Sequence, residues 1–280
     1  MISTAKFFAF WSIIALGELS TPLTEAAEIT ASVTLEGATI HLQAAPPIAQ
    51  TLLADAITVG HDEHLIFLAI DLNDGWKTYW RLPGRFGLAP ELDWQASENV
   101  VDVRTIFPTP SLFDEGDGVS VGYAAPTLWP VVVRSDNTDT PVDVHLSLQI
   151  GLCAEVCLPE RVELSAWLPD LVAQPEITMA QIFRLQNNLA TREQPLHQLS
   201  LDHIGTNISI LLNTTPAKES FAIAEDEQGR HTLLQTSDDP TQSSQALHGE
   251  WRWQTPISSV TVVAPGNRID VFSSSLQDRR

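Results

Sequence analysis

Residues 151–160 read Gly-Leu-Cys-Ala-Glu-Val-Cys-Leu-Pro-Glu and contain both cysteines of the 280-residue chain. Apolar and polar residues alternate before this stretch, over residues 142–150, and after it, over residues 162–168. Because a period of two is typical of a half-buried strand, the sequence predicts a β-hairpin with Cys153 and Cys157 at the two ends of its loop. Facing Cα atoms in a hairpin lie about 4.5–5.5 Å apart, within the range that a disulfide bridges.

A disulfide between these cysteines has two interpretations. As a structural staple it is weak, since closing a ring of about five residues contributes only about 2 kcal/mol in the chain-entropy model. The loop Ala154-Glu155-Val156 has no Gly or Asn to adopt the left-handed conformation of tight hairpins. We therefore expect strain, and strained, exposed disulfides are the reducible ones. The residues alone leave the structural and the redox-active interpretation open.

Length and charge limit the function further. The chain exceeds one average domain and is 44% hydrophobic, which predicts two domains with cores of their own. Its net charge of -20 and pI near 4.5 argue against nucleic acid and anionic membrane surfaces as partners, because binding phosphates needs clustered Lys and Arg.

The N-terminus predicts export. Lys6 is followed by an apolar run over residues 7–16 and by a small-residue site near Thr24-Glu25-Ala26, the pattern of a cleaved signal peptide over residues 1–26. A buried N-terminal helix is the alternative. About ten apolar residues are too few to span a bilayer, so we expect no stable membrane anchor. The expected location is the periplasm, an oxidising space in which disulfides persist.

Short β patterns dominate the first half of the chain. Strand candidates recur at regular spacing and are separated by Pro, Gly, Asn and Asp; they cover residues 29–35, 65–72, 100–107 and 128–133. The run over residues 65–72 is continuously apolar, as expected of a strand buried on both faces. This pattern predicts an antiparallel β-sandwich over residues 27–170.

Two unusual segments lie between these strands. Residues 75–84 read Gly-Trp-Lys-Thr-Tyr-Trp-Arg-Leu-Pro-Gly, whose aromatic side chains either flank a reactive group or fill the sandwich core. Residues 107–118 read Phe-Pro-Thr-Pro-Ser-Leu-Phe-Asp-Glu-Gly-Asp-Gly, and their prolines and glycines predict an irregular acidic loop.

Three motifs follow one another in the order and approximate spacing of a known domain. They are Gly-Trp-Lys-Thr-Tyr-Trp-Arg at 75–81, Phe-Asp-Glu at 113–115 leading to Gly122-Tyr123, and the cysteine stretch at 151–160. Over roughly residues 30–170 the chain resembles the periplasmic N-terminal domain of the DsbD thiol:disulfide interchange family. It is closer to the copper-sensitivity suppressor B branch, because three residues separate its cysteines where the DsbD branch has five.

The resemblance implies an immunoglobulin-like sandwich with a redox-active pair. Cys157 would form the mixed disulfide with a partner and Cys153 would resolve it. Phe113 is the expected aromatic cap of the pair, although Gly116 stands where an ungapped alignment would place the cap residue, and Tyr79 and Trp80 are expected to line the site.

The implied partners are a membrane-embedded thiol reductase and periplasmic thioredoxin-like proteins, between which the domain would relay electrons as a protein-disulfide oxidoreductase component. The multi-helix membrane domain and the thioredoxin-like domain of typical members are absent from this sequence, so we expect them to be separate polypeptides. The alternative is a non-catalytic periplasmic binding module with a structural disulfide.

The charges near the cysteines predict slow exchange in the absence of a partner. Glu155 and Glu160 are negative neighbours that should raise the thiol pKa, and the sequence places no Lys beside the pair. Arg161 is the nearby positive residue. We therefore expect the reduced pair to react when docked to a partner.

The rest of the chain contains no candidate catalytic motif and predicts a linker, a second domain and a tail. Residues 171–195 form a linker with one amphipathic helix that ends near Pro195, and residues 196–273 form a second, smaller β domain, with Trp251 and Trp253 on one strand face. Residues 274–280 form a polar tail. No cofactor is expected, and the spacing of His61 and His64 lacks a third ligand, so no metal is expected either.

Overall fold

The computed structural model describes most of the chain after the predicted signal peptide. The predicted signal peptide over residues 1–26 and the predicted tail over 274–280 lie outside the described residues, which are 31–170, 179–189, 192–195, 200–204, 206–212, 215–239, 241–264 and 267–272. Within this part of the chain, none of the helices is long and apolar enough to cross a bilayer.

The first antiparallel sheet of the sandwich contains the strand that the apolar run predicted. Its order is β1-β2-β3-β9-β6, with bounds Ser32–Thr34, Ala38–Ala44, Glu63–Leu72, Thr127–Ser135 and Val100–Thr105. Six consecutive residues of β3, from Leu65 to Ile70, are buried. One face of β3 meets the sandwich core, and helices cover the other, which is why its sequence does not alternate.

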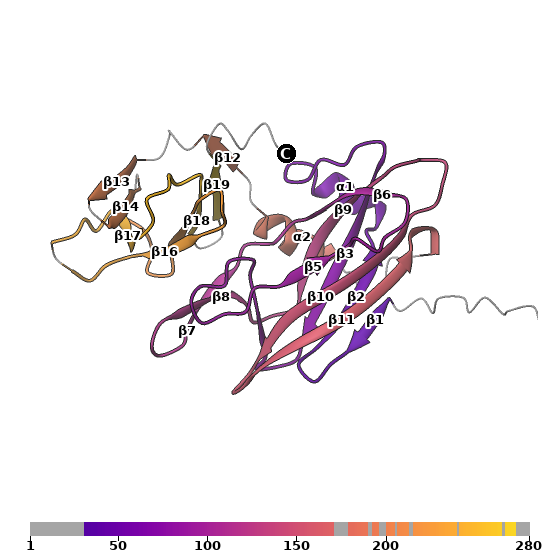
Figure 1. Ribbon diagram of the computed structural model, residues 1–280, viewed down its shortest axis with the longest axis horizontal. Helices are drawn as coiled ribbons and strands as arrows, with labels where there is room; N and C mark the ends of the chain where they lie inside the picture. The colour runs from indigo at the N-terminus through magenta and orange to yellow at the C-terminus, as the bar shows by residue number, and fades with distance from the viewer. Residues whose placement is uncertain are drawn as a thin grey trace, which may run out of the picture.

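The second sheet carries the cysteines. Its order is β11-β10-β4-β8-β7, with β5 also paired to β10; the bounds are Cys157–Trp167, Asp143–Cys153, Lys77–Tyr79, Val119–Tyr123, Ser111–Asp114 and, for β5, Glu91–Asp93. The predicted hairpin of β10 and β11 is confirmed, and the register pairs Cys153 with Cys157 at its end. The two strands run side by side as the longest ribbons of the sandwich (Figure 1).

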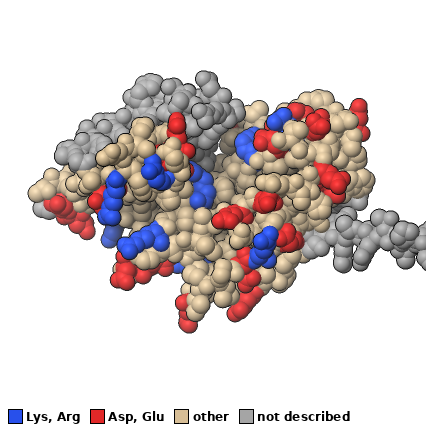
Figure 2. Space-filling model, viewed as in Figure 1, with Lys and Arg blue, Asp and Glu red and all other residues tan. Residues whose placement is uncertain are grey.

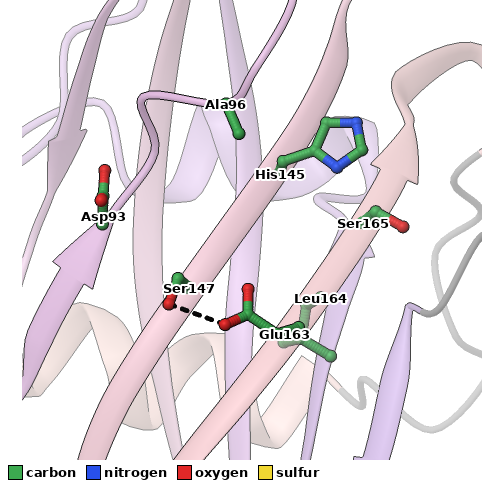
Figure 3. Close-up of a pocket in the computed structure, with 7 residues that line it drawn as sticks. All are labelled: Asp93, Ala96, His145, Ser147, Glu163, Leu164 and Ser165. Carbon is green, nitrogen blue, oxygen red and sulfur yellow. Dashed lines mark hydrogen bonds between the residues drawn. The ribbon is translucent and has the colours of Figure 1, made fainter.

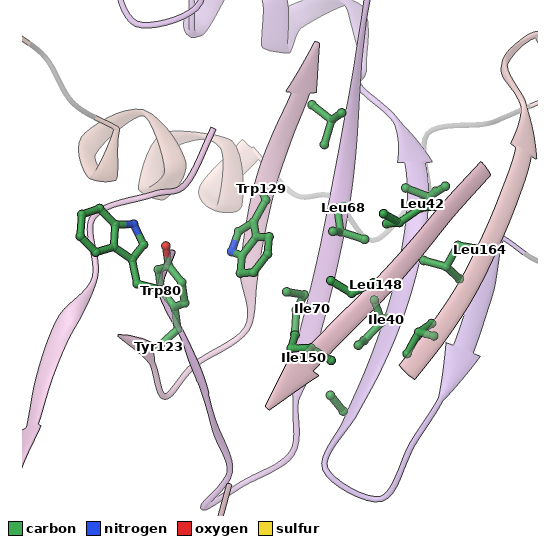
Figure 4. Close-up of a cluster of buried hydrophobic side chains, with 14 of the residues drawn as sticks. Ile40, Leu42, Leu68, Ile70, Trp80, Tyr123, Trp129, Leu148, Ile150 and Leu164 are labelled. Atoms are coloured by element: carbon green, nitrogen blue, oxygen red, sulfur yellow. The ribbon is translucent and has the colours of Figure 1, made fainter. Parts of the chain in front are cut away.

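The core lies between the two sheets and confirms the predicted mainly β, immunoglobulin-like sandwich. Inward-facing aliphatic side chains of both sheets interdigitate, and Trp80, Tyr123 and Trp129 extend the core at one end (Figure 4). Leu68 and Leu148 are fully buried. Burial of each such side chain contributes about 1.5–3 kcal/mol, so this layer is the main source of the sandwich's stability.

Two helices cover the outer face of the first sheet. The short α1, Pro47–Leu52, was not predicted, because six residues are too few to show a helical period. The predicted linking helix is α2, Met179–Asn188, and its buried Ile182 and Leu185 belong to the same cluster as Phe67 of β3.

The linking helix ends earlier than predicted. It stops at Asn188, whose carbonyl oxygen accepts hydrogen bonds from the backbone N–H of Thr109 at 2.5 Å and from its hydroxyl at 2.6 Å. The prediction that it continues to near Pro195 is wrong, because Arg192–Pro195 forms a strand, β12, that pairs with the last strand of the second domain.

The prediction of an irregular acidic loop over residues 107–118 is also wrong in part. Residues 111–114 form β7, which pairs with β8 as a hairpin, and a 3-10 turn, Leu168–Asp170, follows β11. The prolines at 108 and 110 precede the strand and so do not interrupt its pairing, and Gly116 supplies the positive φ of +82° that the turn requires.

The second β domain is confirmed as a single eight-stranded sheet, drawn in brown to yellow in Figure 1. Its pairs are antiparallel except for the parallel pair of β12 and β19. The order is β12-β19-β18-β15-β16-β17-β14-β13, with β13 at Ser200–Ile204, β14 at Asn207–Leu211, β15 at Phe221–Glu225, β16 at His231–Gln235, β17 at Ala246–Glu250, β18 at Ser259–Ala264 and β19 at Asn267–Phe272.

Two tryptophans of this domain lie elsewhere than predicted. Trp251 and Trp253 follow the end of β17 instead of sharing a strand face. Trp251 is buried, its indole N–H donates to the carbonyl of Thr255, and its ring meets that of Trp253 edge-on with centroids 4.8 Å apart. The pair is therefore part of the domain's core packing.

The two domains share a hydrophobic contact. Phe221, Ile223 and Val263 of the second domain belong to the same buried cluster as the sandwich core. Beside this contact, the guanidinium of Arg81 donates to a carboxylate oxygen of Glu225 at 3.0 Å. Arg81 belongs to the aromatic motif that also contains Tyr79, so the second domain is bonded to the segment that approaches the cysteines.

Candidate functional site: the Cys153–Cys157 disulfide

The two cysteines form a disulfide at the open end of the sandwich sheet. Their Cα atoms are 4.0 Å apart, slightly closer than expected for facing strand residues. Cys153 is fully buried, whereas Cys157 and the three loop residues are exposed. Val156, at the tip, is 69% exposed. Cys157 is therefore the more accessible residue of the pair.

Tyr79 contacts both sulfur atoms. Its hydroxyl oxygen lies 3.0 Å from Sγ of Cys153 and 3.3 Å from Sγ of Cys157. Because a disulfide sulfur carries no proton, the tyrosine hydroxyl must be the donor. Burial, together with the negative charge of Glu115, raises the pKa of Tyr79, so its hydroxyl keeps its proton. The site thus has a permanent hydrogen-bond donor directed at its sulfur atoms.

Glycines make room for the tyrosine ring. A Cβ atom on Gly151 would lie 3.1 Å from Cδ2 of Tyr79, and one on Gly87 would lie 2.8 Å from its Cδ1. On β8, a Cβ on Gly122 would lie 2.0 Å from the carbonyl oxygen of Thr78. The hydroxyl of Thr78 donates to the carbonyl of Gly151 at 2.8 Å and so ties β4 to β10 beside the cysteines.

An ion pair lies next to the tyrosine. Lys77 is paired in register with Cys153, and its Nζ lies 2.5 Å from Oε1 of Glu115 in the β7–β8 turn. Ser120 donates its hydroxyl to the same oxygen. Burial raises the pKa of Glu115, but the hydrogen bonds from Lys77 and Ser120 outweigh burial and hold this pKa below its ordinary value. Glu115 is therefore a carboxylate at neutral pH.

The structure also places the other two residues that were predicted at the site, Phe113 and Trp80, and the role of Phe113 as a cap stays a prediction. Phe113 lies on β7, with its ring centroid 5.4 Å from Nζ of Lys77, so it borders the ion pair. Trp80 points to the opposite face from Tyr79 and belongs to the sandwich core, which agrees with the alternative weighed for it from the sequence.

The charged neighbours predicted from the sequence also change. Arg161 pairs in register with Gln149, four positions from the disulfide, and bonds to Glu163 at 3.0 Å in an exposed position. The cation brought beside Cys153 is Lys77, which the sequence analysis missed. The signal was its position two residues before Tyr79, which places both side chains on one strand face.

A hollow of about 260 Å³ lies on the outer face of the same hairpin, away from the cysteines (Figure 3). It is lined by Asp93, Ala96, His145, Ser147, Glu163, Leu164 and Ser165. Cys153 lies six positions after Ser147 along β10, or about 20 Å of strand. Among the described residues, no group of three or more His, Cys, Asp or Glu side chains is arranged to hold a metal.

Charge on the visible surface is mixed. Lys and Arg side chains lie between Asp and Glu side chains on the face shown, without a continuous basic area (Figure 2).

Fold and site together define a thiol:disulfide interchange domain, with a half-exposed disulfide at the end of a sandwich hairpin and a tyrosine hydroxyl within hydrogen-bond distance of both sulfurs. Residues 49–169 match the family model described as "Thiol:disulfide interchange protein DsbD, N-terminal". This part of the chain is a DsbD N-terminal domain, as its motifs predicted. Among curated protein sequences, none matches the chain significantly.

The fold is similar to that of a solved structure. The crystal structure of the N-terminal periplasmic domain of ScsB from Proteus mirabilis matches with a TM-score of 0.58 at 20% sequence identity. The match covers 87% of this chain and 96% of the other, and therefore includes at least part of the second β domain. The likeness in fold thus extends beyond the sandwich.

Proposed function

We propose that the chain is a periplasmic thiol-disulfide exchange protein that relays electrons between a membrane-embedded thiol reductase and periplasmic thioredoxin-like proteins. The observation that carries this proposal is the asymmetry of the disulfide, in which Cys157 is exposed, Cys153 is buried and the hydroxyl of Tyr79 lies within hydrogen-bond distance of both. A purely structural bridge needs neither an exposed cysteine nor a hydrogen-bond donor.

Exchange on this geometry proceeds in two steps. A partner thiolate attacks Sγ of Cys157, the bond between the two protein sulfurs breaks, and Cys153 leaves as a thiolate. The partner's second thiolate then attacks the sulfur of the partner's first cysteine in the mixed disulfide and releases Cys157 as a thiolate. Two electrons pass from the partner dithiol, which becomes a disulfide, and the protein's two thiolates take up protons. When the protein donates electrons, the same steps run in reverse.

Tyr79 acts on the leaving group. The Cys153 thiolate forms in a buried position, where an uncompensated charge is costly. The tyrosine hydroxyl, already 3.0 Å from this sulfur, donates to the developing charge without rearrangement. Donors fixed in place before charge develops lower the barrier most, so Tyr79 favours breaking of the disulfide.

The periplasmic location rests on two observations. The sequence begins with the pattern of a signal peptide, and the similar solved domain of ScsB is described as periplasmic. We propose that the sandwich, residues 27–170, carries the exchange site, and that the second domain, residues 196–273, supports it through the contact of Arg81 with Glu225.

Trapping of mixed disulfides tests this assignment. The probe is thioredoxin without its second active-site cysteine, activated as a mixed disulfide with thionitrobenzoate, whose release is coloured. The Cys153→Ser variant, which keeps the exposed thiol, should release thionitrobenzoate and form a covalent complex, whereas Cys157→Ser should react far more slowly. Equal reaction of the two variants, or of neither, would refute exchange through Cys157.

A further inference from the structure

The ion pair of Lys77 and Glu115 lies on the same face of the sheet as the disulfide. Lys77 is directly opposite Cys153 in the pairing of β4 with β10, and directly opposed residues share a face with their Cβ atoms about 4.5–5.5 Å apart. Tyr79, two residues further along β4, contacts both sulfurs from this face. Lys77 therefore brings a positive charge to the surroundings of the buried Cys153.

The charge of Lys77 is neutralised while the disulfide is closed. Its Nζ lies 2.5 Å from Oε1 of Glu115, and the side chains of Lys77 and Glu115 are only 18% and 23% exposed. Shielding from water strengthens such a pair. Ser120 fixes the same carboxylate oxygen, so Glu115 is held by two donors.

Glu115 sits on a segment with room to move. It begins the turn of the β7–β8 hairpin, where its backbone N–H donates to the carbonyl of Gly118 at 2.8 Å. In the described sheet, β7 is the edge strand and pairs with β8 alone. On its other side the turn borders a groove of about 490 Å³ that Gly118 and Phe86 line together with β16 of the second domain. A shift of the turn into this groove would separate Glu115 from Lys77.

The other charged groups near Cys153 do not replace Lys77. Glu155 lies in the hairpin loop, Glu160 follows Cys157 on the alternate face of β11, and Asp114 adjoins Glu115 on β7; all three are acidic. Arg161 shares the face of the cysteines but bonds to Glu163. Of the charges placed around the disulfide, that of Lys77 has the sign that favours a thiolate.

We propose that Lys77 is a positioning residue that stabilises the Cys153 thiolate during exchange, and that Glu115 is the counter-ion that restrains it while the disulfide is closed. Cys153 leaves as a thiolate when the disulfide is reduced and attacks as a thiolate when it re-forms, and a better-stabilised thiolate leaves faster. Release of Glu115 when a partner docks couples reactivity to docking. This inference rests on the proposed function, since a purely structural bridge has no use for it.

The test measures the rate at which dithiothreitol reduces the disulfide in the purified protein at fixed pH. Lys77→Met should slow reduction and Glu115→Gln should accelerate it, each by about tenfold, as one pKa unit of charge stabilisation implies. Lys77→Arg should keep the wild-type rate within about twofold, because it retains the cation at nearly the same reach. Added salt should change the wild-type rate more than that of Lys77→Met.

Matched controls come from an ion pair of the second domain. Arg252 and Glu250 are also 2.5 Å apart, and Arg252→Met and Glu250→Gln should leave the rate unchanged. If Lys77→Met and Glu115→Gln shift the rate in the same direction, the pair only holds the hairpin in place, and the proposal is overturned; it is equally overturned if neither variant changes the rate.

Dithiothreitol also separates the two proposals, because it needs no protein partner. Opposite shifts with dithiothreitol, without any transfer to thioredoxin-like proteins, would contradict the proposed function and leave the role of Lys77 intact. Transfer to such proteins, with a rate of reduction by dithiothreitol that is unchanged in Lys77→Met and Glu115→Gln, would support the proposed function and overturn the role of Lys77.

Discussion

Replacing Tyr79 with Phe removes the donor that contacts both sulfurs and keeps the ring that fills the slot between Gly87 and Gly151. Hydrogen bonds to charged groups contribute about 1.5–3 kcal/mol. Loss of a hydrogen bond of this strength to the developing Cys153 thiolate should slow reduction by about tenfold to a hundredfold, because each 1.36 kcal/mol is a factor of ten in rate. The stability of the oxidised protein should change by only about 0.5–1.5 kcal/mol, because the disulfide itself is a neutral acceptor.

The assay compares rates of reduction by dithiothreitol with free energies of unfolding in urea. The chain has two tyrosines, and the other is the matched control: the hydroxyl of buried Tyr123 donates to the carbonyl of Pro108 at 2.8 Å. Tyr123→Phe should cost about 1–3 kcal/mol of stability by leaving that carbonyl without its donor, and should not change the rate. A Tyr79→Phe protein that is reduced as fast as wild type would refute the role given to the hydroxyl.

Three further substitutions test contacts in the sandwich and in the second domain. Gly122→Ala should destabilise the protein by about 1–3 kcal/mol in urea unfolding, because the new Cβ meets the carbonyl of Thr78 at 2.0 Å; unchanged stability would show that β8 shifts freely. Glu225→Gln should lower the free energy of unfolding by about 1 kcal/mol or less, because its partner Arg81 is 34% exposed. The circular dichroism spectrum of the protein should not change. Burial raises the pKa of Asp226, but hydrogen bonds from Thr255 and Arg230 outweigh burial and hold this pKa at about 2. The stability that Asp226 contributes is therefore complete above pH 4 and is lost towards pH 2. Asp226→Asn should make unfolding less dependent on pH in that window, and an unchanged acid-unfolding profile would contradict this.

The sequence was most informative where a strand has one solvent-exposed face and one buried face. The alternation around Cys153 and Cys157 predicted the hairpin and its register correctly, because the core fixes which residues point inward. The three motifs likewise predicted the family. Predictions for Tyr79 as a lining residue rested on resemblance, and the structure adds the contact of its hydroxyl with both sulfurs.

Local signals failed where contacts come from distant parts of the chain. Closeness in sequence indicates Arg161 as the cation of the site, whereas Lys77 reaches Cys153 through pairing of strands more than 70 residues apart. The strand at residues 111–114 was missed because prolines and glycines surround it, although they lie outside its paired residues. Pro195 predicts the end of a helix, but it ends an edge strand, where proline is tolerated.

The reduction potential of the Cys153–Cys157 pair decides whether this disulfide is exchangeable. The purified protein is equilibrated with thiol buffers of known potential, and free thiols are trapped and counted. An exchangeable pair should have a potential well above about -300 mV, because structural disulfides typically lie below that value. A potential below about -300 mV, with thiols that react only after unfolding, would contradict exchange through this pair and make the bridge structural.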